Sequence, residues 1–292
     1  MLEDGVWKGP IIDQHIHLDR NNRFLDAISD FEQSGGTAIN LVHKPDFYNL
    51  PKTLDEYRIA YDETLDMAEI VKDKFEIDVS VILGPHPVSW EKQIVTLGIE
   101  KSSELHLQAV ELALEHISEK NAVCLGEVGR PHYPVNSDIW KLANELLLKI
   151  MKRAAKEKVS IQLHVENNGV QTYSDIAKMC EISKMPKKRT IRHFAPPDIS
   201  GDFTNGISST VNVGKGSIAK VVETFSRSNS IWGMETDFLD DFRRPGAVLG
   251  PKTVPKRTQQ LCQKLWESDI SDNEIITLIN NVHSKWPKEI YS

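Results

Sequence analysis

The chain has 292 residues, of which 40% are hydrophobic and 26% are charged, a composition that excludes a disordered or fibrous protein. Its 35 Lys and Arg residues against 42 Asp and Glu residues give a net charge of −7, which excludes a broad positive surface for nucleic acid or an anionic membrane. The three cysteines, Cys124, Cys180 and Cys262, are too few and too far apart for a disulfide framework or a zinc knuckle, so we expect a reducing, cytoplasmic setting. We expect neither secretion nor membrane insertion, because there is no signal-peptide pattern and no apolar run of roughly 18 residues.

Short β-branched runs alternate with longer segments of helical periodicity. The eight predicted strands begin near Ile11, Thr37, Asp78, Ala122, Val159, Thr190, Ile207 and Ile231. Capping boxes at Thr53 and Ser271 mark helix starts, and Gly35-Gly36 marks a helix end. Alternating βα units predict a parallel sheet, and eight of them predict closure into a (β/α)8 TIM barrel, with a doubly wound open sheet as the alternative.

The sixth unit is predicted to depart from this pattern. Between Thr190 and Ile207 there is little room for a full crossover helix, and Pro196, Pro197 and Gly201 disfavour one. We therefore expect a barrel with a reduced sixth helix. Because no linker or internal repeat marks a boundary, residues 1–292 are expected to form one domain.

Residues of metal-binding type stand at the ends of five predicted strands. His15 and His17 end the first strand and project to the same side, because side chains alternate along a strand. The ends of strands four, five, six and eight carry Glu127, His164, His193 and Asp237. Each residue has an ordinary structural explanation, such as a salt bridge or a turn cap. Barrel enzymes build their sites at these strand ends, so together the six predict a site for two divalent ions.

Six motifs define this set more closely: Asp13-Gln14-His15-Ile16-His17-Leu18-Asp19, Gly84-Pro85-His86-Pro87, Gly126-Glu127-Val128-Gly129, Leu163-His164, Ile191-Arg192-His193-Phe194 and Glu235-Thr236-Asp237. On these motifs the chain resembles the TatD-like hydrolases, within the superfamily of metal-dependent amidohydrolase barrels. The resemblance implies that His15, His17 and Asp237 hold a first metal, that Glu127 bridges two ions, and that His164 and His193 hold the second. The wider superfamily often has a carbamylated lysine where this chain has Glu127, which favours the TatD-like branch.

The substrate loops match the family less well than the metal-binding motifs. An arginine commonly follows two residues after the strand-five histidine, and here that position is Glu166. After strand six, Ala195-Pro196-Pro197-Asp198 replaces the usual small, glycine-containing loop. Phe238-Leu239 follows strand eight, where an aspartate-small-proline turn is typical. These departures indicate a divergent branch.

His86, Arg130 and His132 are expected on the substrate side, and His43 and Lys44, which close strand two, are further candidates there. His86, between two prolines, is expected to shape the pocket rather than to bind metal, and His132 could contact substrate or transfer a proton. Arg130 belongs to a set of loop cations that could bind phosphate, together with Arg20, Arg23, Arg192, Arg243, Arg244 and Lys252. Acidic residues share these loops, so the charge signal is mixed. Tyr133, Phe194 and Phe238 are candidates for stacking the bases of a single strand.

Together these features predict a hydrolase with two divalent ions. Zinc is the first choice because most of the predicted ligands are imidazoles, and manganese and magnesium are the alternatives. Asp237 would orient the attacking water, accept its proton and help deliver it to the leaving group. The resemblance implies phosphodiester hydrolysis of the DNase or exonuclease kind, on single strands or ends. Hydrolysis of a small amide, lactone or other ester is the alternative within enzymes. A non-catalytic binding module with a structural metal is the third hypothesis, and the sequence indicates no protein partner.

Overall fold

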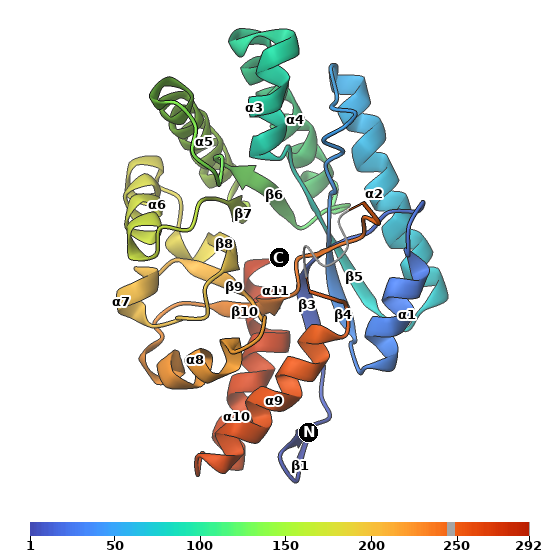
Figure 1. Cartoon of the computed structure of the whole chain (residues 1–292), viewed down its shortest axis with the longest axis vertical. Helices are drawn as coiled ribbons and strands as arrows, with labels where there is room; N and C mark the ends of the chain where they lie inside the picture. The colour runs from blue at the N-terminus through green and yellow to red at the C-terminus, as the bar shows by residue number, and fades with distance from the viewer. Residues whose placement is uncertain (244–248, 292) are drawn as a thin grey trace.

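The computed structural model describes residues 1–243 and 249–291. In this part of the chain, nine parallel strands curl into a barrel-like sheet with helices on its outside (Figure 1). Their order is β10-β9-β8-β7-β6-β5-β4-β3-β11, so strands that follow one another in sequence lie side by side. Only Thr236 and Asp237 separate β10 from β11, and β11 pairs with β3, the first barrel strand. The predicted (β/α)8 TIM-barrel-like fold is confirmed, with an eighth strand that is interrupted at Asp237.

The elements have the following bounds. The strands are β1 (Leu2–Glu3), β2 (Val6–Trp7), β3 (Ile12–His17), β4 (Ala38–Val42), β5 (Asp78–Leu83), β6 (Cys124–Gly129), β7 (Ile161–His164), β8 (Thr190–Ala195), β9 (Ser208–Asn212), β10 (Trp232–Glu235) and β11 (Phe238–Leu239). The α-helices are α1 (Leu25–Gln33), α2 (Leu54–Lys74), α3 (Pro87–Leu97), α4 (Ile99–Ser118), α5 (Ser137–Glu157), α6 (Val170–Ser183), α7 (Gly201–Thr204), α8 (Ser217–Thr224), α9 (Thr253–Glu267), α10 (Asp272–Asn280) and α11 (Trp286–Ile290). Short helical turns follow at η1 (Lys187–Arg189), η2 (Phe225–Arg227) and η3 (Asn281–Lys285).

Local sequence signals account for many of these boundaries. Each of the eight predicted strands begins within two residues of a barrel strand, from β3 to β10. The Thr53 side chain accepts a hydrogen bond from the Glu56 amide at the start of α2, and Ser271 forms a complete capping box with Glu274 at the start of α10. The sixth crossover contains only the four-residue α7, which confirms the reduced sixth helix.

The core has an outer and an inner layer. Between strands and helices, a large cluster includes Ile16 of β3, Phe31 of α1 and Tyr61 of α2. The inner layer is smaller and joins Val42, Ile82, Cys124 and Ile191 to Ile290 and Tyr291. Cys124 is fully buried in this inner layer and packs there as a small hydrophobic side chain. In Figure 1 the chain's last residues lie within the ring of strands, so the C-terminal segment closes the barrel on the side away from the strand ends.

No helix in the described ranges combines the length and the apolar character needed to cross a bilayer.

Candidate metal centre

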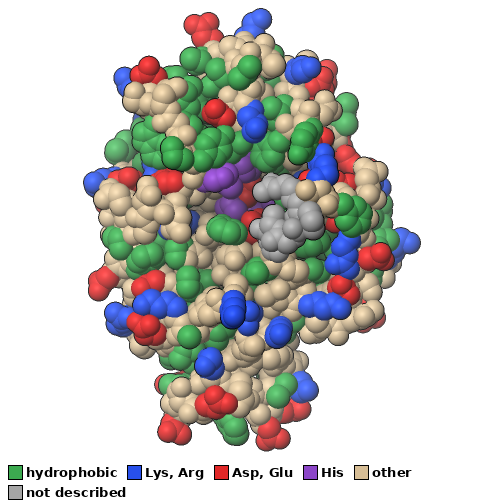
Figure 2. Space-filling view, viewed as in Figure 1, with side chains coloured by type: hydrophobic (Ala, Val, Ile, Leu, Met, Phe, Trp, Pro, Cys, Tyr) green, Lys and Arg blue, Asp and Glu red, His purple; other side chains and the backbone are tan. Residues whose placement is uncertain are grey.

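The structure brings the six predicted ligands together at the C-terminal mouth of the barrel. They come from β3, β6, β7 and β8 and from the break between β10 and β11, and they comprise His15, His17, Glu127, His164, His193 and Asp237. Figure 2 shows histidine side chains gathered at the bottom of a hollow in this face. His15 and Asp237, which are 222 residues apart in the sequence, thus lie side by side.

Glu127 lies at the centre of the cluster. Its Oε1 is 2.9 Å from Nε2 of His193 and 3.2 Å from Nε2 of His15. The same oxygen is 3.6 Å from Nδ1 of His164. Asp237 Oδ1 is 3.5 Å from His15 Nε2 and 3.6 Å from His17 Nε2, which closes the cluster on the other side.

Hydrogen bonding around His17 shows which of its nitrogens faces the centre. His17 Nδ1 lies 3.0 Å from the Val42 carbonyl oxygen, which can only accept, so Nδ1 carries the hydrogen and Nε2 keeps its lone pair. That Nε2 is 3.0 Å from Nε2 of His15. Lone-pair nitrogens and carboxylate oxygens packed this closely fit divalent cations, since imidazole and carboxylate are their usual protein ligands.

Donor atoms within 4.8 Å of one another form two overlapping groups, one with His15, Glu127, His193 and Asp237 and one with His86, Glu127 and His164. His86 differs from the others in its hydrogen bonding. It is the N-cap of α3, and its Nδ1 accepts from the Val88 amide. The neutral ring therefore carries its hydrogen on Nε2, 3.2 Å from Glu127 Oε2. With both nitrogens engaged, His86 orients Glu127 and has no lone pair left for a metal.

His132 reaches the cluster through His164. Nδ1 of His164 faces the centre, 2.9 Å from His193 Nε2, while its Nε2 is 2.6 Å from Nδ1 of His132. The His132 side chain is exposed on the loop after β6. It is thus placed at the mouth, where contact with a substrate remains a prediction.

Arg130 is buried in a contact with Glu166, whereas an arginine that binds phosphate would be accessible at the mouth. Only 2% of its surface is exposed, and its guanidinium donates to both carboxylate oxygens of Glu166 at 2.7 and 2.5 Å. It also donates to Asn144 and lies 4.5 Å from the Trp140 ring. Burial would raise the pKa of Glu166, but the hydrogen bonds from Arg130 hold it below its usual value. The pair joins the loops after β6 and β7, and Glu166 is explained as the partner of Arg130.

The other predicted phosphate-binding cations that the structure describes have protein partners too. Arg20 lies near Glu63 and Asp66, Arg23 and Lys252 pair with Asp30, Arg243 pairs with Asp241, and Arg192 bonds to Asn167 and stacks on Tyr173. Arg244 lies outside the described residues. Of the three aromatic candidates, Phe238 is buried in the core, Tyr133 donates its hydroxyl to Glu91, and Phe194 is 49% exposed.

Two buried carboxylates that sequence reasoning gave no role support the ligands. Asp13 accepts hydrogen bonds from the amides of His15 and Thr236 and from the Thr236 hydroxyl, which ties β3 to the break that carries Asp237. Burial raises the pKa of Asp13 to about 7, although these bonds oppose the shift. Glu235 is fully buried, accepts from the Phe194 amide at 2.6 Å and lies 3.5 Å from Nδ1 of His193. The position of Glu235, two residues before Asp237, could have indicated this role from the sequence, because alternate residues of a strand project to the same face.

Backbone conformation is constrained at the same strand ends. Asp237 and Phe194 have φ values of 51° and 49°, in the left-handed region that non-glycine residues rarely adopt. Gly129 has φ 154°, and a Cβ atom there would lie 1.9 Å from the His164 carbonyl oxygen. The motif Gly126-Glu127-Val128-Gly129 thus ends in glycine because β6 approaches β7 too closely for a side chain.

Burial and mutual repulsion set the charge of the cluster. Burial and the neighbouring His15 lower the pKa of His17 to about 3. Burial also opposes the ionised form of Glu127, but the surrounding histidines, His193 first, hold its pKa well below the usual range. For Asp237, burial outweighs the attraction of His15 and His193 and raises the pKa to about 7. Burial opposes the protonated forms of His15 and His193, but Glu127 raises the pKa of both, whereas burial lowers that of His164. The centre therefore presents an ionised Glu127 that favours protonation of its two nearest imidazoles.

Comparison with known proteins assigns the family. A family model described as TatD related DNase matches residues 12–283. The chain belongs to the TatD-related DNase family. An uncharacterized protein of Methanocaldococcus jannaschii is 29% identical over 264 residues, which cover 87% of this chain and 88% of that protein.

Solved structures share the fold. The TatD homologue YJJV from Escherichia coli aligns with a TM-score of 0.60 at 17% identity, over 96% of this chain and 97% of its own. The phosphotriesterase homology protein from Escherichia coli, solved with phosphate in its active site, aligns with a TM-score of 0.57 at 11% identity, over 100% of both chains. The TatD-related family and this barrel identify the protein as a metal-dependent hydrolase.

Proposed function

We propose that this TatD-related protein uses two divalent ions to hydrolyse phosphodiester bonds at the barrel mouth. The observation that carries the proposal is the convergence of the six strand-end residues, with His15, His164 and His193 around Glu127 Oε1 and with Asp237 against His15 and His17. His15, His17 and Asp237 would hold one ion and His164 and His193 the other, with Glu127 between them. When bound, such ions lower the pKa of a water toward about 7 and neutralise developing negative charge. Zinc is our first choice because the donors are mainly imidazole.

The chain's own residues divide the remaining work. Asp237 accepts the proton of the attacking water on its carboxylate and returns it to the leaving group. Asp13 holds the backbone before Asp237, Glu235 holds the strand end that carries His193, and His86 holds Glu127. These contacts orient the ligands before substrate arrives, which reduces the cost of assembling the site.

A second candidate is the hydrolysis of a small, uncharged ester, lactone or amide. The paired loop cations favour it, because a polyanion needs cations that are free to replace its counterions. The same ligands and the same proton acceptor serve both reactions. We place either activity in a reducing, cytoplasmic setting, supported by three buried free thiols.

A substrate panel with controlled metal content tests the proposal. Bound metal is removed with a chelator, and circular dichroism checks that the protein stays folded. Zinc, manganese or magnesium is then added back. Each preparation is assayed on single-stranded DNA, RNA, bis(p-nitrophenyl) phosphate, a lactone and a cyclic amide. We expect phosphodiester cleavage that chelation abolishes and metal restores while the fold persists. Lactone or amide hydrolysis without phosphodiester cleavage would support the second candidate. Unfolding on chelation would indicate a structural metal instead.

A further inference from the structure

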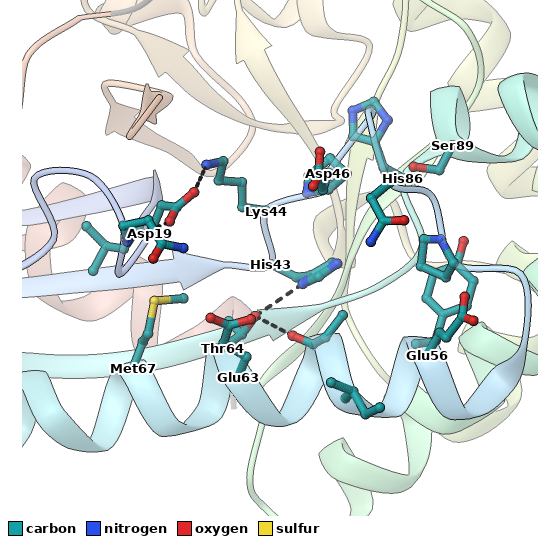
Figure 3. Close-up of a pocket in the computed structure, with 18 of the residues that line it drawn as sticks. Asp19, His43, Lys44, Asp46, Glu56, Glu63, Thr64, Met67, His86 and Ser89 are labelled. Carbon is teal, nitrogen blue, oxygen red and sulfur yellow. Dashed lines mark hydrogen bonds and ion pairs between the residues drawn. The ribbon is translucent and has the colours of Figure 1, made fainter. Parts of the chain in front are cut away.

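Beside the metal centre lies a cavity of about 490 Å³ that the proposed mechanism does not use. It runs from His86 along the first half of α2, beneath the loop that follows β4 (Figure 3). None of the six proposed ligands is among the described residues that line it. Ligand sites usually have volumes of about 300 to 1,000 Å³, so the cavity has the size of a binding site for a small organic group.

His43 gives the cavity a defined hydrogen-bonding character. Its Nδ1 lies 3.1 Å from the Thr64 hydroxyl, which donates its own hydrogen to the Ala60 carbonyl oxygen. The hydroxyl must therefore accept from Nδ1, and Nε2 of His43 keeps an unprotonated lone pair. Burial lowers the pKa of His43 to about 4, although Glu127 opposes the shift, so the ring is neutral at pH 7.

The free nitrogen faces the cavity. His43 is only 8% exposed and lines the cavity wall, and in Figure 3 its second ring nitrogen points away from Thr64 into the space on the His86 side. The described contacts give this Nε2 no hydrogen-bond donor from the protein. This nitrogen is not fully enclosed by the protein, so a hydrogen-bond donor that enters the cavity can reach it.

The charges around the cavity do not favour an anionic occupant. Its described lining has three cations against four carboxylates, namely Lys44, Lys52 and Arg243 against Asp19, Asp46, Glu56 and Glu63. The Lys44 ammonium is paired with Asp19 and the Arg243 guanidinium with Asp241. Leu18, Tyr57 and Met67 add apolar surface. A neutral ring with polar edges matches this lining better than a phosphate.

We propose that the cavity binds the uncharged organic part of the substrate, a nucleoside-like ring system that donates an N–H or O–H hydrogen bond to Nε2 of His43. The inference rests on the proposed function, because His86 lines the cavity and also contacts Glu127 of the metal centre. The phosphodiester would then lie at the metals and the nucleoside beside α2. His43 is a specificity residue in this arrangement.

Two substrates with the same leaving group separate recognition from chemistry. Thymidine 5′-(p-nitrophenyl phosphate) carries N–H and O–H donors, whereas bis(p-nitrophenyl) phosphate carries none. His43→Phe should raise KM for the thymidine ester about three- to tenfold, the range of one neutral hydrogen bond, and change bis(p-nitrophenyl) phosphate kinetics by less than about twofold. His43→Gln, whose amide oxygen can accept in place of Nε2, should restore most of the loss. His106→Phe, a buried histidine of α4 outside the cavity, is the matched control and should leave the KM ratio unchanged.

A binding measurement keeps this test independent of catalysis. Thymidine alone is titrated into the full chain labelled with ¹⁵N-histidine, and we expect the Nε2 resonance of His43 to shift while its Nδ1 stays protonated. An equal effect of His43→Phe on both substrates, or an unshifted His43 at millimolar thymidine, overturns the proposal. If neither phosphodiester is cleaved, the proposed function fails, and the titration still decides whether the cavity binds the nucleoside.

Discussion

Asp237 combines a strained backbone with a buried carboxylate at the centre of the proposed chemistry. Its φ of 51° is held by the interrupted eighth strand, and its amide donates to the His15 carbonyl oxygen. The side chain contacts both histidines of β3. Backbone and side-chain contacts both hold Asp237 in place, so a side chain of the same size is expected to occupy the same position.

We predict that Asp237→Asn lowers kcat by about 10² to 10⁴ while the metal content stays near normal, because the amide keeps one coordinating oxygen and loses the proton acceptor. His164→Ala should instead reduce metal content, and excess metal should partly restore its activity. Both kcat and metal content are measured on the same preparations. Near-normal kcat in a fully metallated Asp237→Asn variant would move the proton acceptor to His132, since Glu166 is occupied by Arg130.

The sequence predicted the positions of the ligands better than their partners. Strand alternation and barrel topology are local rules, so they placed His15, His17 and the later strand ends at one mouth. The role of His86 depends on its hydrogen bond to Val88, and that of Glu235 on a contact with Phe194, 41 residues away. Such contacts follow from loop conformation and packing, which no local pattern encodes.

At the scale of elements, the ends of β6 and β7 are held together by the buried pair of Arg130 and Glu166. The carboxylate of Glu166 also accepts from the Thr172 hydroxyl of α6. Sequence patterns predicted each strand start within two residues. They also predicted that Arg130 binds substrate, because an arginine in a loop is normally exposed. Its partner lies 36 residues away and became visible only in the folded chain.

We predict that Arg130→Ala lowers the free energy of unfolding by about 3 to 5 kcal/mol, because it leaves Glu166 buried without its counter-charge. Arg153→Ala is the matched control. Arg153 pairs with Glu111 and Glu157 at the surface, so its loss should cost less than about 1 kcal/mol. Urea unfolding of both variants gives the comparison. Similar losses in the two variants would mean that the Arg130 pair does not stabilise the loop junction.

The charge of the whole molecule bears on any activity toward nucleic acid. Its net charge is −7, and Arg23, Arg130, Arg243 and Lys252 at the mouth are paired with carboxylates of the protein. We therefore predict that cleavage of DNA or RNA falls as salt rises and favours ends or single strands over intact duplex. The measurement is kcat/KM for a single-stranded oligonucleotide and its duplex across a salt series. Undiminished duplex cleavage at high salt would contradict this prediction.

Two buried histidines outside the proposed metal centre, His283 and His106, bear on acid stability. Nδ1 of His283 accepts from the Ile12 amide and cannot also carry a hydrogen, and its Nε2 contacts the Thr258 hydroxyl. Burial lowers the pKa of His283 to about 3, and burial alone lowers that of His106 to about 3. Because these pKa values are depressed in the folded state, the unfolded chain binds more protons below about pH 6.5. Their contribution to stability is complete above that pH and is lost as the pH falls toward 3.

We predict that the free energy of unfolding falls steeply below about pH 6.5, by up to about 1.4 kcal/mol per pH unit for each of the two histidines. His283→Asn keeps an oxygen that can accept from the Ile12 amide but does not titrate, so its curve should start lower at pH 8 and decline less steeply. His106→Gln should flatten the curve in the same way, and the two effects should add because the residues lie in separate helical regions. Urea unfolding at several pH values from 8 to 5 measures all three slopes. Parallel curves for the variants and the native chain would show that other groups, such as the carboxylates of the surface pairs, govern acid unfolding.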